Sequence, residues 1–276
     1  MRIINGKEIA SKIYGEVKEE VGKLSFQPVF CDVLVGEDPA SRQYVGMKAR
    51  AAQRLGFKFR SAEFPSTVTT EVLIGEIKSI SQEPNMRGLI VQLPLPATLP
   101  RREILDAIEP EIDVDCMGSK NLGDFYRGEI RFVPPTAAAI MTILDSLNTD
   151  LSLKNFLVVG QGELVGRPAA FLLKRRGFKV NVADVTTKNT AELLKSADVV
   201  ISAAGKAGLI TGSKIRPGAV IIDAGTSESE GGIVGDVDFA TIRDIAGAVS
   251  PVPGGVGPVT VAQLLANVVL SAQSGR

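Results

Sequence analysis

The sequence contains no histidine, only two cysteines, and equal numbers of acidic and basic residues among its 276 positions. Without histidine, the chain has no Ser-His-Asp triad, no Cys-His pair and no His-ligated zinc site. Proton transfer near neutral pH therefore falls to Lys, Asp, Glu, Tyr, Cys or water. Cys31 and Cys116 follow no metal-binding or redox spacing, so we expect free thiols in a reducing cytoplasm and no metal site.

The charge and hydropathy patterns exclude further classes of protein. A formal net charge of +0 gives no footprint for nucleic acid or an anionic membrane surface. No apolar run approaches the ~20 residues that a membrane-spanning helix needs. The segment from Met1 to Lys7 lacks the apolar core of a signal peptide. We therefore expect a cytoplasmic α/β protein with one large or two medium domains.

The first half of the chain places polar side chains after an apolar strand. Residues 29–35 predict a buried strand, and Asp38 followed by Pro39 predicts the start of a helix. On this helix Tyr44 and Lys48 are four residues apart, so they share one face. Both can point at a ligand near the strand end, where open α/β sheets bind ligands. Taken alone, a half-buried tyrosine beside a solvated lysine is the better explanation, because lysine is mostly exposed.

A second apolar strand is predicted over 88–92 and ends in Gln92. A buried amide needs a hydrogen-bond partner, so Gln92 is either a ligand contact or a polar strand end. Downstream, Asp113 and Asp115 alternate in a loop that suits a hydrated turn, a cation site or a ligand clamp. Helical spacing predicts three further helices, at 6–24, 70–82 and 101–109. Thr136 is expected to cap another helix.

The second half predicts a dinucleotide-binding fold. A strand over 156–159 precedes a glycine-rich turn and a helix that runs to about 175. Such a turn places a pyrophosphate on backbone N–H groups at the helix N-terminus. Its spacing, G-x-G-x-x-x-G, is one residue longer than the usual fingerprint. The residues expected to contact the cofactor here are Gly160, Gln161, Gly162, Glu163, Val165 and Gly166.

Further strands are predicted to alternate with helices, which indicates a Rossmann-type, doubly wound parallel sheet. They are expected at 180–183, 199–205, 219–225 and 246–249. Ala204 and Gly205, which end the second of these, are further cofactor candidates. The segment 250–260 then holds three prolines and three glycines. It is either a rigid turn before the last helix or a loop shaped to a ligand.

Several of these segments resemble signatures of the bifunctional methylenetetrahydrofolate dehydrogenase/methenyltetrahydrofolate cyclohydrolase family. They are VGEDPASRQYVGMKARAAQRLGF, GLIVQLPLP, DVDCMG, SADVVISAAG, GDVDF and PVPGGVGPVT. The resemblance implies oxidation of methylenetetrahydrofolate to the methenyl compound with a nicotinamide cofactor, then hydrolysis to formyltetrahydrofolate. The alternatives are a dehydrogenase without hydrolase activity and a non-catalytic folate- or dinucleotide-binding relative.

The resemblance also implies an architecture and residue roles. A folate-binding catalytic domain would comprise 1–135 and 253–276, and a dinucleotide-binding domain 136–252, with a cleft between them. Family habit suggests a homodimer. Lys48 would carry the proton in hydrolysis, with Gln92 fixing its position and Tyr44 alongside. The residues that would bind the folate are Asp115, Pro253, Gly254, Gly255 and Val256.

The chain departs from the family pattern at three places. Cys116 stands where glycine is usual, so either the thiol crowds the loop or the backbone there needs no positive φ. Pro135 replaces a usual cysteine. Asp184 ends the strand 180–183, where an acid typically binds the ribose of NAD and repels a 2′-phosphate. Thr186 and Thr187 would hold that phosphate if Asp184 turned away. Family habit favours NADP, which we expect, with NAD as the alternative.

Overall fold

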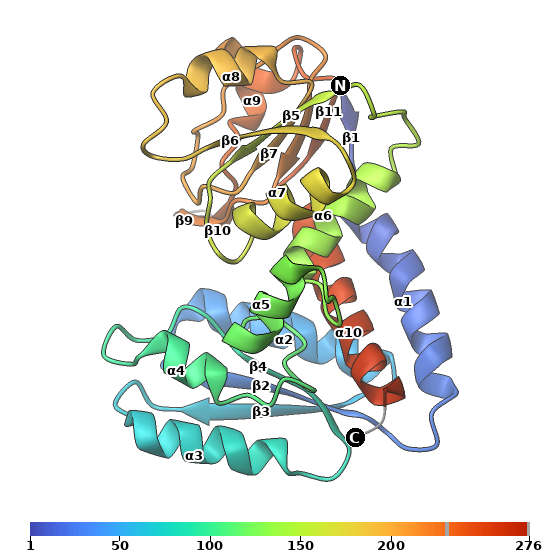
Figure 1. The fold of residues 1–276 in the computed structure, drawn as a ribbon, viewed down its shortest axis with the longest axis vertical. Coiled ribbons are helices and arrows are strands. Elements are labelled where there is room, and N and C mark those ends of the chain that lie inside the picture. Colours follow the sequence, from blue (N-terminus) through green and yellow to red (C-terminus); the bar gives the residue numbers. More distant parts are fainter. Residues whose placement is uncertain (230–231, 275–276) are drawn as a thin grey trace. The chain divides into compact units, whose positions relative to one another are not determined.

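The computed structural model describes residues 1–229 and 232–274, and it contains two parallel sheets (Figure 1). Contacts divide the chain into two compact units, Met1–Ser11 with Thr136–Thr260 and Lys12–Pro135 with Val261–Arg276. We call them the large-sheet unit and the small-sheet unit. The division falls inside α1 (Gly6–Gly22) and α10 (Val256–Gln273).

This division differs from the expected domains at the N-terminus and near residue 253. β1 (Arg2–Ile3) pairs in parallel with β11 (Ala248–Ser250), so the first residues join the large sheet. The Gly6 N–H also donates to the Gly254 carbonyl at 2.9 Å. Pairing across such a sequence separation leaves no signal in local spacing.

The large sheet has six strands, and all of its strand pairs are parallel. Its order is β1-β11-β8-β7-β5-β6. The strands beyond β1 and β11 are β5 (Asn155–Val159), β6 (Lys179–Ala183), β7 (Val199–Ser202) and β8 (Val220–Asp223). Near-continuous apolar runs such as VVIS suit parallel strands buried on both faces. The predicted doubly wound sheet is confirmed.

Helices cover both faces of this sheet, with α8 and α9 on one side and α6 and α7 on the other (Figure 1). Their bounds are α6 (Pro135–Asp145), α7 (Gly166–Arg175), α8 (Thr190–Ser196) and α9 (Phe239–Ile242), with a short 3₁₀ turn at Gly212–Lys214. α6 begins at Pro135, so Thr136 lies in its first turn and the expected cap there is wrong. A hairpin of β9 (Ser227–Ser229) and β10 (Gly232–Val234) was not expected.

The small sheet has the order β3-β2-β4 and is also parallel. Its strands are β2 (Val29–Val35), β3 (Lys58–Phe64) and β4 (Met86–Val91). Its helices are α2 (Pro39–Arg54), α3 (Thr70–Ser81), α4 (Arg101–Asp106) and α5 (Ser119–Arg127). Helices α2 and α3 lie on opposite faces of this sheet (Figure 1). β2 is its central strand, and all seven of its residues are buried.

Helix α10 corrects the expectation that no segment approaches membrane length. It is 18 residues long and apolar enough to cross a membrane by length and composition, yet 56% of it is buried inside the protein. Asn267 Nδ2 donates to the Val114 carbonyl at 2.8 Å, and Ser271 Oγ donates to the Glu111 carbonyl at 2.8 Å. These polar contacts and the buried fraction are typical of a core helix.

Candidate functional site

The small sheet changes winding direction at β2. The chain leaves β2 for β3 on one side, and β4 lies on the other. Such switch points are where open α/β sheets bind ligands. The Asp38 side chain accepts a hydrogen bond from the Ser41 N–H at 2.7 Å and so caps α2, as predicted. From this start, one face of α2 buries Val45, Lys48 and Ala52 towards the sheet.

The Lys48 amine is held by two side chains, one from β2 and one from the residue that directly follows β4. Its Nζ lies 2.7 Å from Gln92 Oε1 and 2.6 Å from Asp32 Oδ2. Gln92 is itself fixed, because its backbone N–H donates to the Val33 carbonyl at 2.8 Å and its Nε2 donates to the Leu93 carbonyl at 2.6 Å. The structure therefore brings the predicted Lys48 and Gln92 together at the switch point.

Asp32 is the member of this cluster that sequence reasoning missed. It lies in the middle of β2 with its side chain 0% exposed. Its Oδ1 has no hydrogen-bond partner among the described residues. Burial raises the pKa of Asp32, and the Lys48 charge opposes that rise. The available signal was one charged residue inside the apolar run VFCDVLV, because buried charges are rare unless paired.

The alternating acids of the Asp113 loop have different roles. Asp113 accepts hydrogen bonds from the backbone N–H groups of Met117 at 3.1 Å and Gly118 at 2.9 Å, so it shapes the loop. Asp115 makes no such contact in the described structure and is half-buried. Burial raises the pKa of Asp115 to about 6, and the positive charge of Lys48 opposes this. Among the described residues, no cluster of three or more acidic, cysteine or histidine side chains is arranged to hold a metal ion.

Two other predicted positions in this unit are informative. Cys116 has φ +57°, so the backbone does adopt the left-handed conformation, and the alternative without positive φ is wrong. Both cysteines are free and buried, as expected. Tyr44 lies one helical turn before Lys48 and is half-buried, and this burial raises the pKa of its phenol.

The glycine-rich turn lies at the switch point of the large sheet, between β5 and β7. Gly160 has φ +91°, and a Cβ there would lie 2.2 Å from the Ala203 carbonyl oxygen. A Cβ at Gly166 would lie 1.9 Å from the Gly160 oxygen. At Gly162, by contrast, a Cβ would meet nothing within 4 Å. The outer glycines therefore permit close packing, and the middle glycine leaves open space.

Helix α7 starts beside this turn with an uncapped end. Its N-cap residue is Val165, and no side chain caps it. The first N–H groups of a helix lack partners within the helix and favour an anion. Gln161 Nε2 donates to the Gly160 carbonyl at 2.9 Å, and Glu163 follows Gly162 in the turn. An open space beside an uncapped helix fits a dinucleotide pyrophosphate.

The remaining cofactor candidates lie after β6 and β7. The Ala204 N–H donates to Asp236 Oδ2 at 2.7 Å, so this donor is already used, while Gly205 is exposed with φ +62°. Asp184 Oδ1 accepts hydrogen bonds from the Thr186 N–H at 2.9 Å and from Thr186 Oγ1 at 2.7 Å. Thr187 Oγ1 lies 3.2 Å from the same oxygen. These bonds, chiefly those from Thr186, lower the pKa of Asp184.

The proline- and glycine-rich loop belongs to the large-sheet unit. Its Gly255 N–H donates to the Pro251 carbonyl at 2.7 Å, and a Cβ at Gly6 would lie 1.8 Å from the Gly255 oxygen. Gly254 has φ +102°, Pro253 is exposed and Val256 is buried. The four predicted substrate-binding residues of this loop, Pro253 to Val256, therefore fall in a different compact unit from Lys48.

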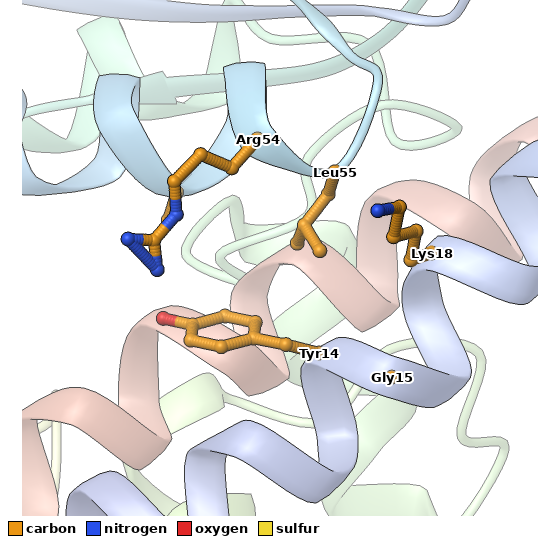
Figure 2. Close-up of a pocket in the computed structure, with 6 residues that line it drawn as sticks. Tyr14, Gly15, Lys18, Arg54 and Leu55 are labelled. Atoms are coloured by element: carbon orange, nitrogen blue, oxygen red, sulfur yellow. The ribbon is translucent and has the colours of Figure 1, made fainter.

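Two pockets lie within single units. One, of about 400 Å³, lies between α1 and α2 and is lined by Tyr14, Gly15, Lys18, Ala51, Arg54 and Leu55 (Figure 2). It contains none of the predicted site residues. The other, of about 250 Å³, lies beside Asp223 and Val252 in the large-sheet unit, next to the proline- and glycine-rich loop.

Comparisons with known proteins cover almost the whole chain. Residues 4–115 match the model of the tetrahydrofolate dehydrogenase/cyclohydrolase catalytic domain, and residues 134–276 match that of its NAD(P)-binding domain. The chain belongs to the tetrahydrofolate dehydrogenase/cyclohydrolase family. The resemblance seen in the motifs is thereby confirmed, with its class of enzyme and its nicotinamide cofactor.

Individual family members agree with this assignment. The bifunctional protein FolD of Lactobacillus gasseri is 38% identical over 98% of this chain and 96% of its own. That of Hydrogenobaculum is 41% identical over 97% of each chain. The solved FolD structure from Campylobacter jejuni has a TM-score of 0.94 at 34% identity, covering 99% of both chains. The FolD structure from Trypanosoma brucei, in complex with NADP and an inhibitor, has a TM-score of 0.93 at 35% identity, covering 99% of this chain and 97% of that one.

Proposed function

We propose that this chain oxidises methylenetetrahydrofolate and hydrolyses the methenyl product, with Lys48 as the proton carrier of the second reaction. The observation that carries the proposal is the 2.7 Å contact between Lys48 Nζ and Gln92 Oε1 at the switch point of the small sheet. In a chain without histidine, a buried lysine fixed beside an amide is a suitable group for moving a proton.

The two reactions make different demands on the protein. In the first, the bridging nitrogens of the folate stabilise the cation that forms, so the protein contributes mainly positioning. In the second, a water oxygen bonds to the methenyl carbon while a water proton passes to Lys48 Nζ. The bond from that carbon to one ring nitrogen then breaks, the nitrogen takes up the proton held by Lys48, and the remaining hydroxyl proton leaves to solvent as the formyl carbonyl forms.

The other predicted site residues are proposed to bind the folate. Asp115, whose pKa is raised to about 6, is proposed to accept hydrogen bonds from the pterin ring when it is ionised. Tyr44 is proposed to pack beside the folate. The loop from Pro253 to Val256 is also proposed to border the folate.

NADP is the proposed cofactor, held by the turn from Gly160 to Gly166 and by Gly205. When bound, the nicotinamide supplies the hydride acceptor. The Trypanosoma brucei relative, 35% identical, was solved with NADP. Because Asp184 Oδ1 is engaged by Thr186, its carboxylate is partly satisfied within its own turn, which weakens the argument for NAD.

Two further features follow from the family resemblance. We propose a homodimer, as the family habit suggests, which size-exclusion chromatography with light scattering would test. We propose a cytoplasmic location, because both cysteines are free and buried rather than paired.

The test compares wild type, Lys48→Met and the control Lys58→Met, which changes an exposed lysine of the small sheet. Oxidation and hydrolysis are followed by absorbance with NADP and NAD in parallel. We expect wild type and Lys58→Met to perform both reactions with a preference for NADP. Lys48→Met should lose hydrolysis by roughly 10²–10⁴-fold, the usual contribution of acid–base catalysis, and retain oxidation.

Each contrary outcome identifies the part of the proposal that fails. Normal hydrolysis by Lys48→Met would remove Lys48 from the mechanism. Accumulation of the methenyl compound by wild type would indicate a dehydrogenase alone. Folate binding without either reaction would indicate a non-catalytic relative, and a preference for NAD would make Asp184 the selector.

A further inference from the structure

The Asp32–Lys48 pair is unusual for a buried ion pair because, among the described residues, the Lys48 amine is the one polar group that meets the Asp32 carboxylate. Lys48 and Asp32 side chains are 8% and 0% exposed, and Nζ lies 2.6 Å from Oδ2. Asp32 Oδ1 has no hydrogen-bond partner among the described residues. A buried ion pair with an unsatisfied oxygen rarely adds stability over apolar residues of similar size. The pair therefore calls for a functional explanation.

The direction of the Asp32 side chain follows from strand alternation. Val29, Cys31, Val33 and Val35 pack into the core shared with α3 and α4. Successive side chains of a strand point to opposite faces, so Asp32 faces the α2 side. An apolar residue would fill this central position without any cost of burying charge. The carboxylate instead meets the one lysine whose amine Gln92 also holds.

The charge of the reacting species gives Asp32 a purpose. The methylene compound has no positive charge at its bridge, whereas the methenyl compound is a cation. An unpaired ammonium at Lys48 would repel the cationic methenyl compound and would not repel the methylene compound. A low-dielectric site strengthens such repulsion. A carboxylate 2.6 Å from the amine cancels the charge of the protonated form, which is the form that Lys48 reaches when it takes up the water proton in the proposed hydrolysis.

We propose that Asp32 is a positioning residue that holds the Lys48 amine against Gln92 and supplies the counter-charge that lets this amine stand beside a cationic folate. The inference rests on the proposed function, because it takes the folate site to be at Lys48. The other charged or titratable groups around Lys48 are Asp115, from the loop before α5, and Tyr44, on α2 itself. Asp115 is the second carboxylate whose field a bound cation would feel.

The test is the ratio of the KM for methenyltetrahydrofolate to the KM for methylenetetrahydrofolate, measured for wild type and variants at one neutral pH. Asp32→Asn keeps the shape of the side chain and removes its charge. We expect this ratio to rise tenfold or more in Asp32→Asn relative to wild type, because the Lys48 ammonium then faces the cationic folate without its counter-charge. The matched control Val33→Ala destabilises the same strand from its other face and should leave the ratio unchanged.

A merely structural role would affect both substrates alike. Equal changes in the two KM values, and hence an unchanged ratio in Asp32→Asn, would overturn the proposal. Since the ratio measures binding of two folates, it stays informative if Lys48→Met shows that Lys48 does not move the proton. In that case the assignment of Lys48 as the proton carrier fails, and the KM ratio still tests whether Asp32 supplies the counter-charge to the Lys48 amine.

A second measurement covers the case in which Asp32→Asn does not fold. Lys48→Met leaves the Asp32 carboxylate buried without a partner, which is costly. The double variant Asp32→Asn with Lys48→Met should therefore unfold at a higher temperature than Lys48→Met alone. A lower temperature for the double variant would overturn the pairing.

Discussion

Both sheets have their candidate sites at the switch point of the strand order, but the residues that form the two sites differ in type. At β2 and β4 the small sheet gathers charged and amide side chains, with Lys48 Nζ within 2.7 Å of both Gln92 and Asp32. At β5 and β7 the large sheet has glycines in place of residues with side chains. Gly160 therefore packs closely on the Ala203 carbonyl, and space remains open at Gly162. Proton transfer needs a titratable side chain that is fixed in position. Binding an anion needs free backbone N–H groups and enough open space for the anion.

Buried acids sharpen the contrast. In the large-sheet unit, Asp236 accepts hydrogen bonds from Ser202 Oγ and the Ala204 N–H, each at 2.7 Å. Asp223 accepts from the Gly225 and Asp236 N–H groups at 3.0 and 3.1 Å. These acids brace loops through backbone donors. Asp32 has no such donors in the described structure, so it does not brace a loop in this way.

The largest effect is expected where the large sheet tolerates no side chain. In Gly160→Ala, the new Cβ would lie 2.2 Å from the Ala203 oxygen at a residue with φ +91°. We expect a loss of about 3 kcal/mol in unfolding free energy or more, since both a clash and backbone strain are introduced. Dinucleotide binding, measured by cofactor fluorescence titration, should be lost.

Gly162→Ala is the matched control, because its Cβ would meet nothing within 4 Å. Its unfolding free energy should stay within about 0.5 kcal/mol of wild type, while cofactor binding weakens if the open space holds the pyrophosphate. If Gly160→Ala bound the cofactor as well as wild type, the glycine turn would not be the binding element.

A smaller effect is expected at Asp115 in the small-sheet unit, and it depends on pH. Its folded pKa of about 6 lies above the unfolded value of ~3.9. Between these values the folded state binds more protons, so ionised Asp115 lowers stability as the pH rises through this window. We expect Asp115→Asn to be more stable than wild type by about 1–2 kcal/mol at pH 7.5.

This advantage should shrink to about 0.5 kcal/mol at pH 4, where the folded carboxyl is protonated and the unfolded one is about half protonated, and urea unfolding at the two pH values would measure it. Folate affinity of wild type should fall below pH 6 as the carboxylate gains its proton, and that of Asp115→Asn should change little. A stability advantage that persisted unchanged at pH 4 would show that ionisation is not its cause.

Sequence patterns predicted the elements whose signal is local. Apolar runs located β2 and β5, and the Asp38–Pro39 pair located the start of α2. By contrast, β3 has the mixed sequence KFRSAEF and gives little apolar signal. β1 is defined by pairing with residues near 248, which no local pattern reveals. Asp32 was missed because its partner, Lys48, lies on the following helix. Spacing rules within a single strand or helix do not link residues on two different elements.

The smallest effect concerns a departure from the family pattern at Cys116, which is buried with φ +57°. A non-glycine residue in this conformation costs about 1–2 kcal/mol. In ordinary buried positions alanine is more stable than glycine by roughly 0.5–1 kcal/mol, but here the order should reverse. We expect Cys116→Gly to exceed Cys116→Ala by about 1 kcal/mol in unfolding free energy.

Both variants lose the buried thiol, so their difference isolates the backbone term, and urea unfolding would measure it. If Cys116→Ala were the more stable of the two, the left-handed conformation would not be costly in this loop. Cys116 directly follows Asp115, so Cys116→Gly also alters the loop that carries the Asp115 carboxylate. Because Cys116→Gly keeps that carboxylate, it should change folate affinity less than Asp115→Asn does. An equal loss would mean that the backbone, more than the carboxylate, sets the folate-binding geometry of this loop.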